Sequence, residues 1–191
     1  SVFAIMVEKG SELAHDDPNR KYTGRVVFQG NQVRDQNWEM AMFQELASSP
    51  ASMQAAKAVD LVGCLPGNKC EQADATQAYT QAKLQGVDTW VRLPKERWPD
   101  NWLKDNPNLK DPVVPLVLAL YGHPEAGVYW EKHAEKRLFE AGFERIPNWR
   151  SCYHHKERGV FLVVYVDDFK MSGPPEMVDQ CWSDITGKPQ G

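Results

Sequence analysis

The chain has 191 residues, of which 42% are hydrophobic and 25% are charged, and its formal net charge is −4 at pH 7. This length suffices for one domain with a sizeable core, or for a large domain with a small subdomain. The acidic balance argues against a free-standing, high-affinity nucleic-acid binder, because such binding depends on clustered Lys and Arg.

The first 63 residues predict one strand and two helices. Residues 1–20 are polar and mixed in charge, and Lys21–Phe28, "KYTGRVVF", predicts a strand. Apolar residues recur at helical spacing over Asn37–Ala47, which predicts a helix. The pair Ser49–Pro50 is typical of a helix start, and a second helix follows it up to Gly63.

The middle of the chain alternates short strands with an insertion. We expect strands at Lys69–Asp74, "KCEQAD", and at 88–94, "DTWVRLP". Residues 95–112 are rich in Pro, Asn and charge, which indicates a surface loop. The apolar spacing over 126–141 predicts a helix that ends at Gly142.

The C-terminal part predicts a hairpin and then a helix. Residues 151–155, "SCYHH", and 159–166, "GVFLVVYV", are apolar segments separated by a polar turn. The tail from Pro175 begins as a helix and then frays. Because strands and helices intermingle without regular alternation, we predict an α+β domain with helices packed on one face of an antiparallel sheet.

The longest apolar run, Val160 to Val166, is far too short to cross a membrane. The N-terminus also lacks the basic-then-apolar pattern of a signal peptide. We therefore expect an intracellular protein, cytoplasmic or nuclear, with no membrane contact. The four cysteines fall in no C-x-x-C spacing and are expected to be free thiols: Cys64, Cys70, Cys152 and Cys181.

Two adjacent carboxylates, Asp167 and Asp168, follow the apolar run. Neighbouring side chains on a strand point to opposite faces, so a tight turn here would put both at the tip of a hairpin. The plain interpretation is a solvated turn, because Asp is common in turns. Asp74 ends another strand, and carboxylates from two strand ends can hold a pair of divalent ions for phosphoryl transfer.

Several ordered segments carry a family resemblance: "ADATQAY", "LALYGHPEAGVYWEKH", "EAGFE", "SCYHH" and "VVYVDDFKMSG", with "GRVVFQGNQVRD" and "ASSPAS" upstream. Together they resemble the reverse transcriptase domain of copia-type LTR retrotransposons, from about Lys21 to Gly173. The resemblance implies polymerase fingers at about 21–68 and a palm with an antiparallel sheet at about 69–175. It also implies a truncated tail at 176–191 and no thumb.

The resemblance implies an RNA-directed DNA polymerase that uses two Mg²⁺ ions, with Mn²⁺ as an alternative. Its partners would be an RNA template, a DNA primer, a deoxynucleoside triphosphate and the rest of a Pol polyprotein (thumb, RNase H and integrase). Asp74 and Asp167 match the metal-binding carboxylates, Asp168 matches a supporting acid, and Tyr79 matches the ring beneath the incoming sugar. The remaining matches are nucleotide contacts at Arg25, Ala75 and Glu125, and primer-terminus contacts at Tyr165 and Val166.

The chain departs from the family pattern after Gly122. Where the family usually reads Leu-Lys-Gln-Ala-Pro-Arg, residues 123–128 read "HPEAGV", so Glu125 replaces an amide and two positive charges are lost. A carboxylate there should weaken triphosphate binding, which favours a catalytically inactive remnant with weak nucleic-acid or protein binding as the alternative. An unrelated metal-dependent phosphodiesterase would use similar acids but would leave Tyr79 unexplained.

Overall fold

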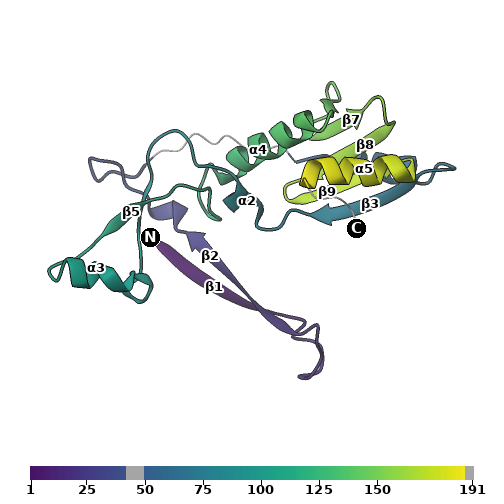
Figure 1. Cartoon of the computed structure of the whole chain (residues 1–191). Coiled ribbons are helices and arrows are strands. Elements are labelled where there is room, and N and C mark those ends of the chain that lie inside the picture. Colours follow the sequence, from purple (N-terminus) through teal and green to yellow (C-terminus); the bar gives the residue numbers. More distant parts are fainter. Residues whose placement is uncertain (42–49, 188–191) are drawn as a thin grey trace. The chain divides into compact units, whose positions relative to one another are not determined.

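The computed structural model describes residues 1–41 and 50–187 (Figure 1). The chain divides into two compact units. The first comprises Ser1–Glu45 and Ala82–Ala126, and the second comprises Leu46–Gln81 and Gly127–Gly191. The described residues contain antiparallel sheets and a few helices, as expected for the α+β class. Within them, no helix has the length and apolar character of a membrane span.

A two-stranded ribbon begins the first unit. Strand β1 (Val2–Lys9) pairs antiparallel with β2 (Lys21–Phe28), from Val2 opposite Phe28 to Lys9 opposite Lys21. The prediction of β2 is confirmed, whereas β1 lies in the segment that we described only as polar. Side chains on both faces of β1 are largely exposed, so the strand lacks the alternation that marks a half-buried strand in a sequence.

The helix predicted over Asn37–Ala47 is wrong in its first part. Asn37 lies in a turn, and Arg34 and Met40 form an isolated β-bridge. The Asp35 carboxylate accepts hydrogen bonds from the backbone N–H groups of Asn37 and Glu39, at 2.8 and 3.0 Å. Such local bonds offer the backbone an alternative to the helix. Residues 42–47 of the prediction lie outside the described residues.

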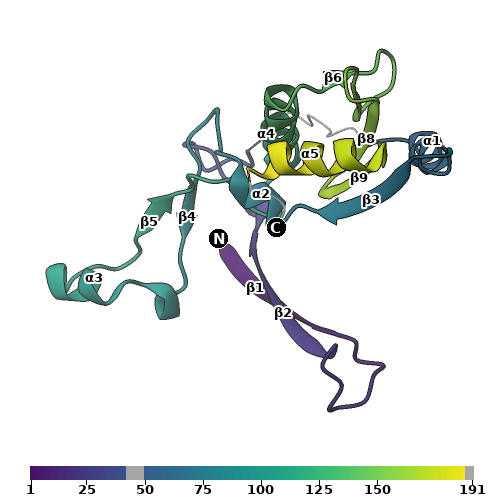
Figure 2. The same ribbon diagram turned by 45° about the vertical axis from the view of Figure 1, so that its right-hand side comes forward.

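The first unit also holds the insertion, between β4 (Trp90–Arg92) and β5 (Val113–Pro115) (Figure 2). The 3₁₀ turn η2 (Lys95–Arg97) and the short helix α3 (Asp100–Asp105) lie within it, so the segment is not wholly a loop. Pro99 precedes α3 and Asp100 lies in its first turn, a combination that favours helix initiation. A second 3₁₀ turn, η1 (Gly30–Gln32), follows β2.

The second unit is built on a five-stranded antiparallel sheet with the order β3-β9-β8-β7-β6. Its strands are β3 (Lys69–Asp74), β9 (Asp168–Gly173), β8 (Val160–Tyr165), β7 (Cys152–His155) and β6 (Glu144–Arg145). The predicted strand β3 and the predicted β7–β8 hairpin are both confirmed. Because the edge strand β3 pairs with β9, distant parts of the chain meet at one edge of this sheet.

Helices α4 (Ala126–Glu140) and α5 (Pro175–Thr186) lie alongside the sheet (Figure 1). They pack on one face, where the core includes Trp130, Leu138, Leu162, Met171, Val178 and Cys181. Gly142, with φ +85°, closes α4 as predicted. The predicted helix at Pro175 is confirmed as α5, which has 12 residues with Pro175 at its start and Gly187, with φ +67°, at its end. The last residues of the predicted tail, 188–191, lie outside the described residues.

Helix α1 (Met53–Gly63) packs on the opposite face, so the prediction of helices on one face only is wrong. Strand β8 alternates: Leu162 faces α4 and α5, whereas Val163 packs with Ala55 and Val59 of α1. Helix α1 begins at the N-cap Ser52, whose hydroxyl accepts from Ala55 N–H at 3.2 Å, three residues beyond the predicted start. Its predicted end is confirmed. The four-residue helix α2 (Ala78–Gln81) follows β3.

Candidate functional site

Two carboxylates face each other at the ends of β3 and β9. Asp74 is the direct pairing partner of Asp168, and residues opposite each other in an antiparallel pair lie on the same face. A hydrogen bond from Asp74 raises the pKa of Asp168, and burial and the charges of Asp74 and Asp167 raise it further. A hydrogen bond between two carboxyl groups requires a shared proton, so this pair holds an excess of negative charge that a proton or a cation can offset.

The turn beside this pair consists of Val166 and Asp167, because Tyr165 pairs with Asp168. Of the two adjacent aspartates, only Asp167 lies in the turn, because Asp168 is already the first residue of β9. The sequence suggested that both lie at the tip. Val166 has φ +58°. Two-residue hairpins favour such angles, but a β-branched residue rarely adopts them, and the strain is worth about 1–3 kcal/mol.

Two hydrogen bonds hold the backbone of this turn. The indole N–H of Trp130, a residue of α4 that is only 4% exposed, donates to the Val166 carbonyl oxygen at 2.7 Å. The backbone N–H of Ala75 donates to the Asp167 carbonyl oxygen at 2.8 Å. The strained turn is therefore fixed from the helix layer and from the segment that carries Asp74.

The carboxylate pair belongs to a row that crosses three strands. Tyr165 on β8 lies opposite Asp168, which lies opposite Asp74, so all three share the face of the sheet on which α1 packs. The Tyr165 side chain is 55% exposed. Gln72 lies next along the same face of β3, and its side-chain hydrogen bond to Asp168 acts to lower the pKa of that carboxyl.

The carboxylate oxygens at this edge of the sheet are suitable ligands for a hard divalent cation. Mg²⁺ prefers oxygen ligands and is usually held by one or two protein carboxylates together with substrate phosphates. Asp74 and Asp168 offer such a pair, and none of the influences on the Asp168 pKa comes from a Lys or Arg that would already neutralise it. Within residues 1–41 and 50–187, His, Cys, Asp and Glu side chains form no cluster of three or more arranged as a ready-made metal cage.

The remaining predicted site residues lie in two places. Tyr79 on α2 and Ala75 just after β3 are half-buried and pack against the core beneath α4 and α5. They belong to the same unit as the carboxylates. The side chain of Tyr79 thus contributes to packing, and its contact with a sugar stays a prediction.

Arg25 and Glu125 belong to the first unit. Arg25 is exposed on β2, and its guanidinium lies 5.6 Å from the ring centroid of Tyr121. The backbone N–H of Glu125 donates to Nδ1 of His123 at 3.2 Å. His123 is itself 5% exposed, and this burial lowers its pKa. Arg25 thus lies on a strand of the first unit, and Glu125 lies in a tight turn of the same unit.

The two residues that support the pair, Trp130 and Gln72, were not predicted from the sequence as site residues. Trp130 was assigned only to the apolar face of a helix, although its indole N–H needs a partner when buried. The sequence of the turn itself indicates that other residues hold its backbone. A hairpin with a two-residue loop usually requires a positive φ, and Val at such a position indicates a backbone held by other contacts.

The chain was compared with protein-family models, with curated proteins and with solved structures, and none of them matches. The residues and their geometry are therefore the basis for the function proposed below.

Proposed function

We propose that the chain is an RNA-directed DNA polymerase domain of a copia-like retrotransposon polyprotein, which joins a primer 3′-hydroxyl to a deoxynucleoside triphosphate. One observation supports this proposal above the others. Asp74 and Asp168 meet across β3 and β9, with Asp167 in the adjoining turn, so carboxylates from two separated motifs gather at one edge of a sheet.

In this proposal, Asp74, Asp167 and Asp168 hold two Mg²⁺ or Mn²⁺ ions. When bound, the ions would supply activation of the attacking hydroxyl and stabilisation of the leaving oxygen. Tyr165, the last residue of β8, and Val166, the first residue of the turn, position the primer terminus next to the exposed ring of Tyr165. The fixed backbone of the turn limits how far this position can drift, which favours in-line attack.

The other proposed contacts concern the triphosphate and the template. Arg25 neutralises part of the triphosphate charge, Ala75 contacts the nucleotide, and Tyr79 excludes a ribose 2′-hydroxyl. The RNA template and DNA primer bind together with the remainder of the Pol polyprotein. That remainder supplies the thumb that grips the duplex, because the acidic chain alone offers few clustered cations.

A catalytically inactive remnant of the same fold is the second candidate, and Glu125 favours it. The usual amide at this position would donate hydrogen bonds to a phosphate, whereas a carboxylate repels it. A remnant would keep the sheet and the turn for packing reasons and retain at most weak nucleic-acid or protein binding.

Primer extension on an RNA template, with Mg²⁺ or Mn²⁺, tests the proposal. We expect incorporation by the wild type and by a version extended with its natural downstream sequence, and its loss in Asp74→Asn and Asp167→Asn. Asp184→Asn is a matched control, because Asp184 lies on α5 and pairs with Arg158 of the β7–β8 turn, outside the carboxylate row. Incorporation restored only by Glu125→Gln would support the remnant, and none in any version would refute polymerase activity.

A further inference from the structure

A pocket of about 430 Å³ lies within the second unit, on the face of the sheet that α4 and α5 cover. Its walls include Ala75, Trp130, His133, Arg137, Phe169 and Trp182. Sites for small molecules typically measure 300–1,000 Å³ and combine apolar walls with a few polar groups. Most of the pocket wall lies apart from the carboxylate row, because Ala73 and Phe169 point to this face whereas Asp168 points to the other. Of the row, Asp74 alone also lines the pocket, at the end of β3.

Aromatic side chains form much of the pocket wall. Trp130 and Phe169 meet edge to face with their ring centroids 6.4 Å apart, and both residues are less than 10% exposed. His133 stacks on Trp130 at 5.9 Å between centroids and an interplanar angle of 26°. Such rings favour a planar aromatic guest through stacked or edge-to-face contacts.

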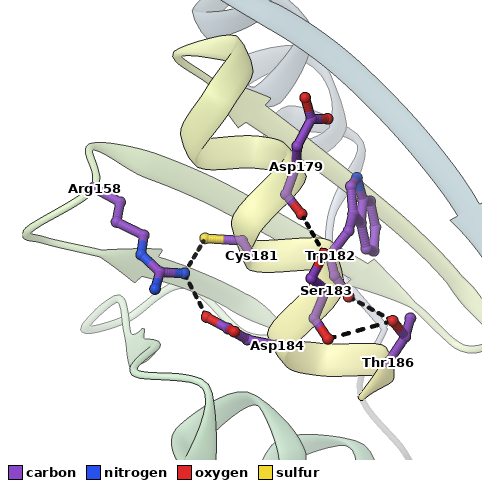
Figure 3. Close-up of polar contacts among 7 residues, drawn as sticks. All are labelled: Arg158, Asp179, Cys181, Trp182, Ser183, Asp184 and Thr186. Atoms are coloured by element: carbon purple, nitrogen blue, oxygen red, sulfur yellow. Dashed lines mark hydrogen bonds and ion pairs between the residues drawn. The ribbon is translucent and has the colours of Figure 1, made fainter. Parts of the chain in front are cut away.

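Trp182 adds a second indole from α5. Figure 3 shows Trp182 and Thr186 on one side of this helix, and Arg158, Cys181 and Asp184 on the other. Thr186 and Trp182 are joined by the bond from the Thr186 hydroxyl to the Trp182 carbonyl oxygen, at 2.8 Å. The Trp182 side chain is 8% exposed, and within the described part of the chain its indole N–H donates to no acceptor. It is therefore a donor available to a guest.

The basic groups in the pocket come from α4, and the one acidic group among its described lining residues is Asp74. His133 and Arg137 are one helical turn apart, and Nη2 of Arg137 donates to the Ile185 carbonyl oxygen at 3.2 Å, which ties the guanidinium to the end of α5. Its other near partner is Glu140, at 3.6 Å and on the exposed surface. A guanidinium has five N–H donors, so this arrangement leaves donors for a planar, bidentate anion.

We propose that this pocket binds a small planar aromatic anion, such as an aryl carboxylate or sulfonate, with its ring against Trp130 and Trp182 and its acid group on Arg137 and His133. The proposal does not depend on the polymerase function, because none of the four side chains that contact the anion is assigned to that reaction. Asp74 and Ala75, which are assigned to it, line the pocket without making these contacts. An aliphatic anion lacks the ring for the aromatic wall, and a neutral aromatic lacks the charge for Arg137, so both should bind less tightly.

The test uses the whole chain and 2-naphthalenesulfonate as the probe. Binding is followed by calorimetry and by the indole N–H signals in ¹H–¹⁵N NMR spectra. We expect saturable binding, with the signals of Trp130 and Trp182 shifting most. Arg137→Gln should weaken binding roughly tenfold, an effect typical of losing one charge-assisted contact. Methanesulfonate and 2-naphthalenemethanol should each bind at least about tenfold more weakly than the probe.

Lys136→Gln is the matched control, because Lys136 is adjacent in sequence, 77% exposed and outside the pocket. It should bind like the wild type. His133→Gln provides a second test if Arg137→Gln does not fold, and it too should weaken binding. Equal losses in Lys136→Gln and Arg137→Gln, or shifts confined to other indoles, would overturn the proposal.

Discussion

The indole N–H of Trp130 donates to the Val166 carbonyl oxygen across 2.7 Å, so helix α4 holds the turn that presents Asp167. Val166 adopts φ +58° in that turn. A strained backbone persists only where surrounding contacts enforce it. The Trp130 bond and the bond from Ala75 N–H to the Asp167 carbonyl provide that enforcement from two elements.

Replacing Trp130 with Phe should destabilise the protein, because it removes the bond to Val166 and leaves space in the core. We expect a loss of about 1–3 kcal/mol in the free energy of unfolding, measured by urea denaturation. Trp149→Phe is the control: Trp149 is 43% exposed, and its change should cost less than about 1 kcal/mol. Equal losses for the two variants would contradict the role assigned to the indole bond.

At residue 166, the Gly variant should be more stable than the Ala variant, which reverses the usual order of stability. At an ordinary backbone angle, a protein with Gly is less stable than one with Ala, because Gly gives the unfolded chain more conformational freedom. At φ +58°, any Cβ costs about 1–2 kcal/mol. Val166→Gly should therefore be more stable than Val166→Ala by roughly 1 kcal/mol in thermal or urea unfolding. The reverse order would show that the turn relaxes to a negative φ.

The pairing of Asp74 with Asp168 should make stability depend on pH. The folded pKa of Asp168 is raised above the usual 3.8, so the protonated form favours folding. This contribution is present below about pH 3.8 and is lost as pH rises through the folded pKa. At pH 7 without divalent ions, Asp168→Asn should be more stable than the wild type by about 0.2–1 kcal/mol.

Measuring the stability of the wild type and of Asp168→Asn again in MgCl₂ distinguishes two causes of any difference, repulsion between the carboxylates and a change in packing. A cation bound only to the folded state raises the free energy of unfolding by RT ln(1 + c/Kd), which grows with the cation concentration c. The melting temperature of the wild type should therefore rise with Mg²⁺, while that of Asp168→Asn should rise less. Asp60→Asn, which removes from α1 the carboxylate that pairs with Lys170 of β9, controls for general charge effects. A stability gain in Asp60→Asn equal to that in Asp168→Asn would contradict the interpretation.

The four cysteines should fall into two reactivity classes. Burial raises the pKa of the Cys152 thiol to about 11 and also raises the pKa of Cys181, whereas Cys64 and Cys70 are exposed. Because the thiolate is the reactive form, a chromogenic disulfide reagent at pH 8 should titrate two thiols quickly in the native protein. The other two should react only after denaturation in urea. Rapid reaction of all four would show that the core opens readily.

The sequence alone determined the features that depend on neighbouring residues. The strands Lys21–Phe28 and Lys69–Asp74 were predicted with their observed bounds. The end of α4 at Gly142 was also predicted, because a left-handed helix cap is a local requirement that Gly meets at low cost. The β7–β8 hairpin followed from two apolar runs and a polar turn. These patterns depend on residues that are close together in the sequence and need no contact with a distant segment.

Tertiary structure decided which carboxylate meets Asp74. The sequence placed Asp167 first, but the register of β3 against β9 puts Asp168 opposite Asp74. A shift of one residue would have moved every side chain of the strand to the other face. The position of α1 on the second face of the sheet, and the reach of Trp130 to Val166, likewise depend on contacts between distant segments. Register and packing are set by the burial of whole surfaces, which no local pattern specifies.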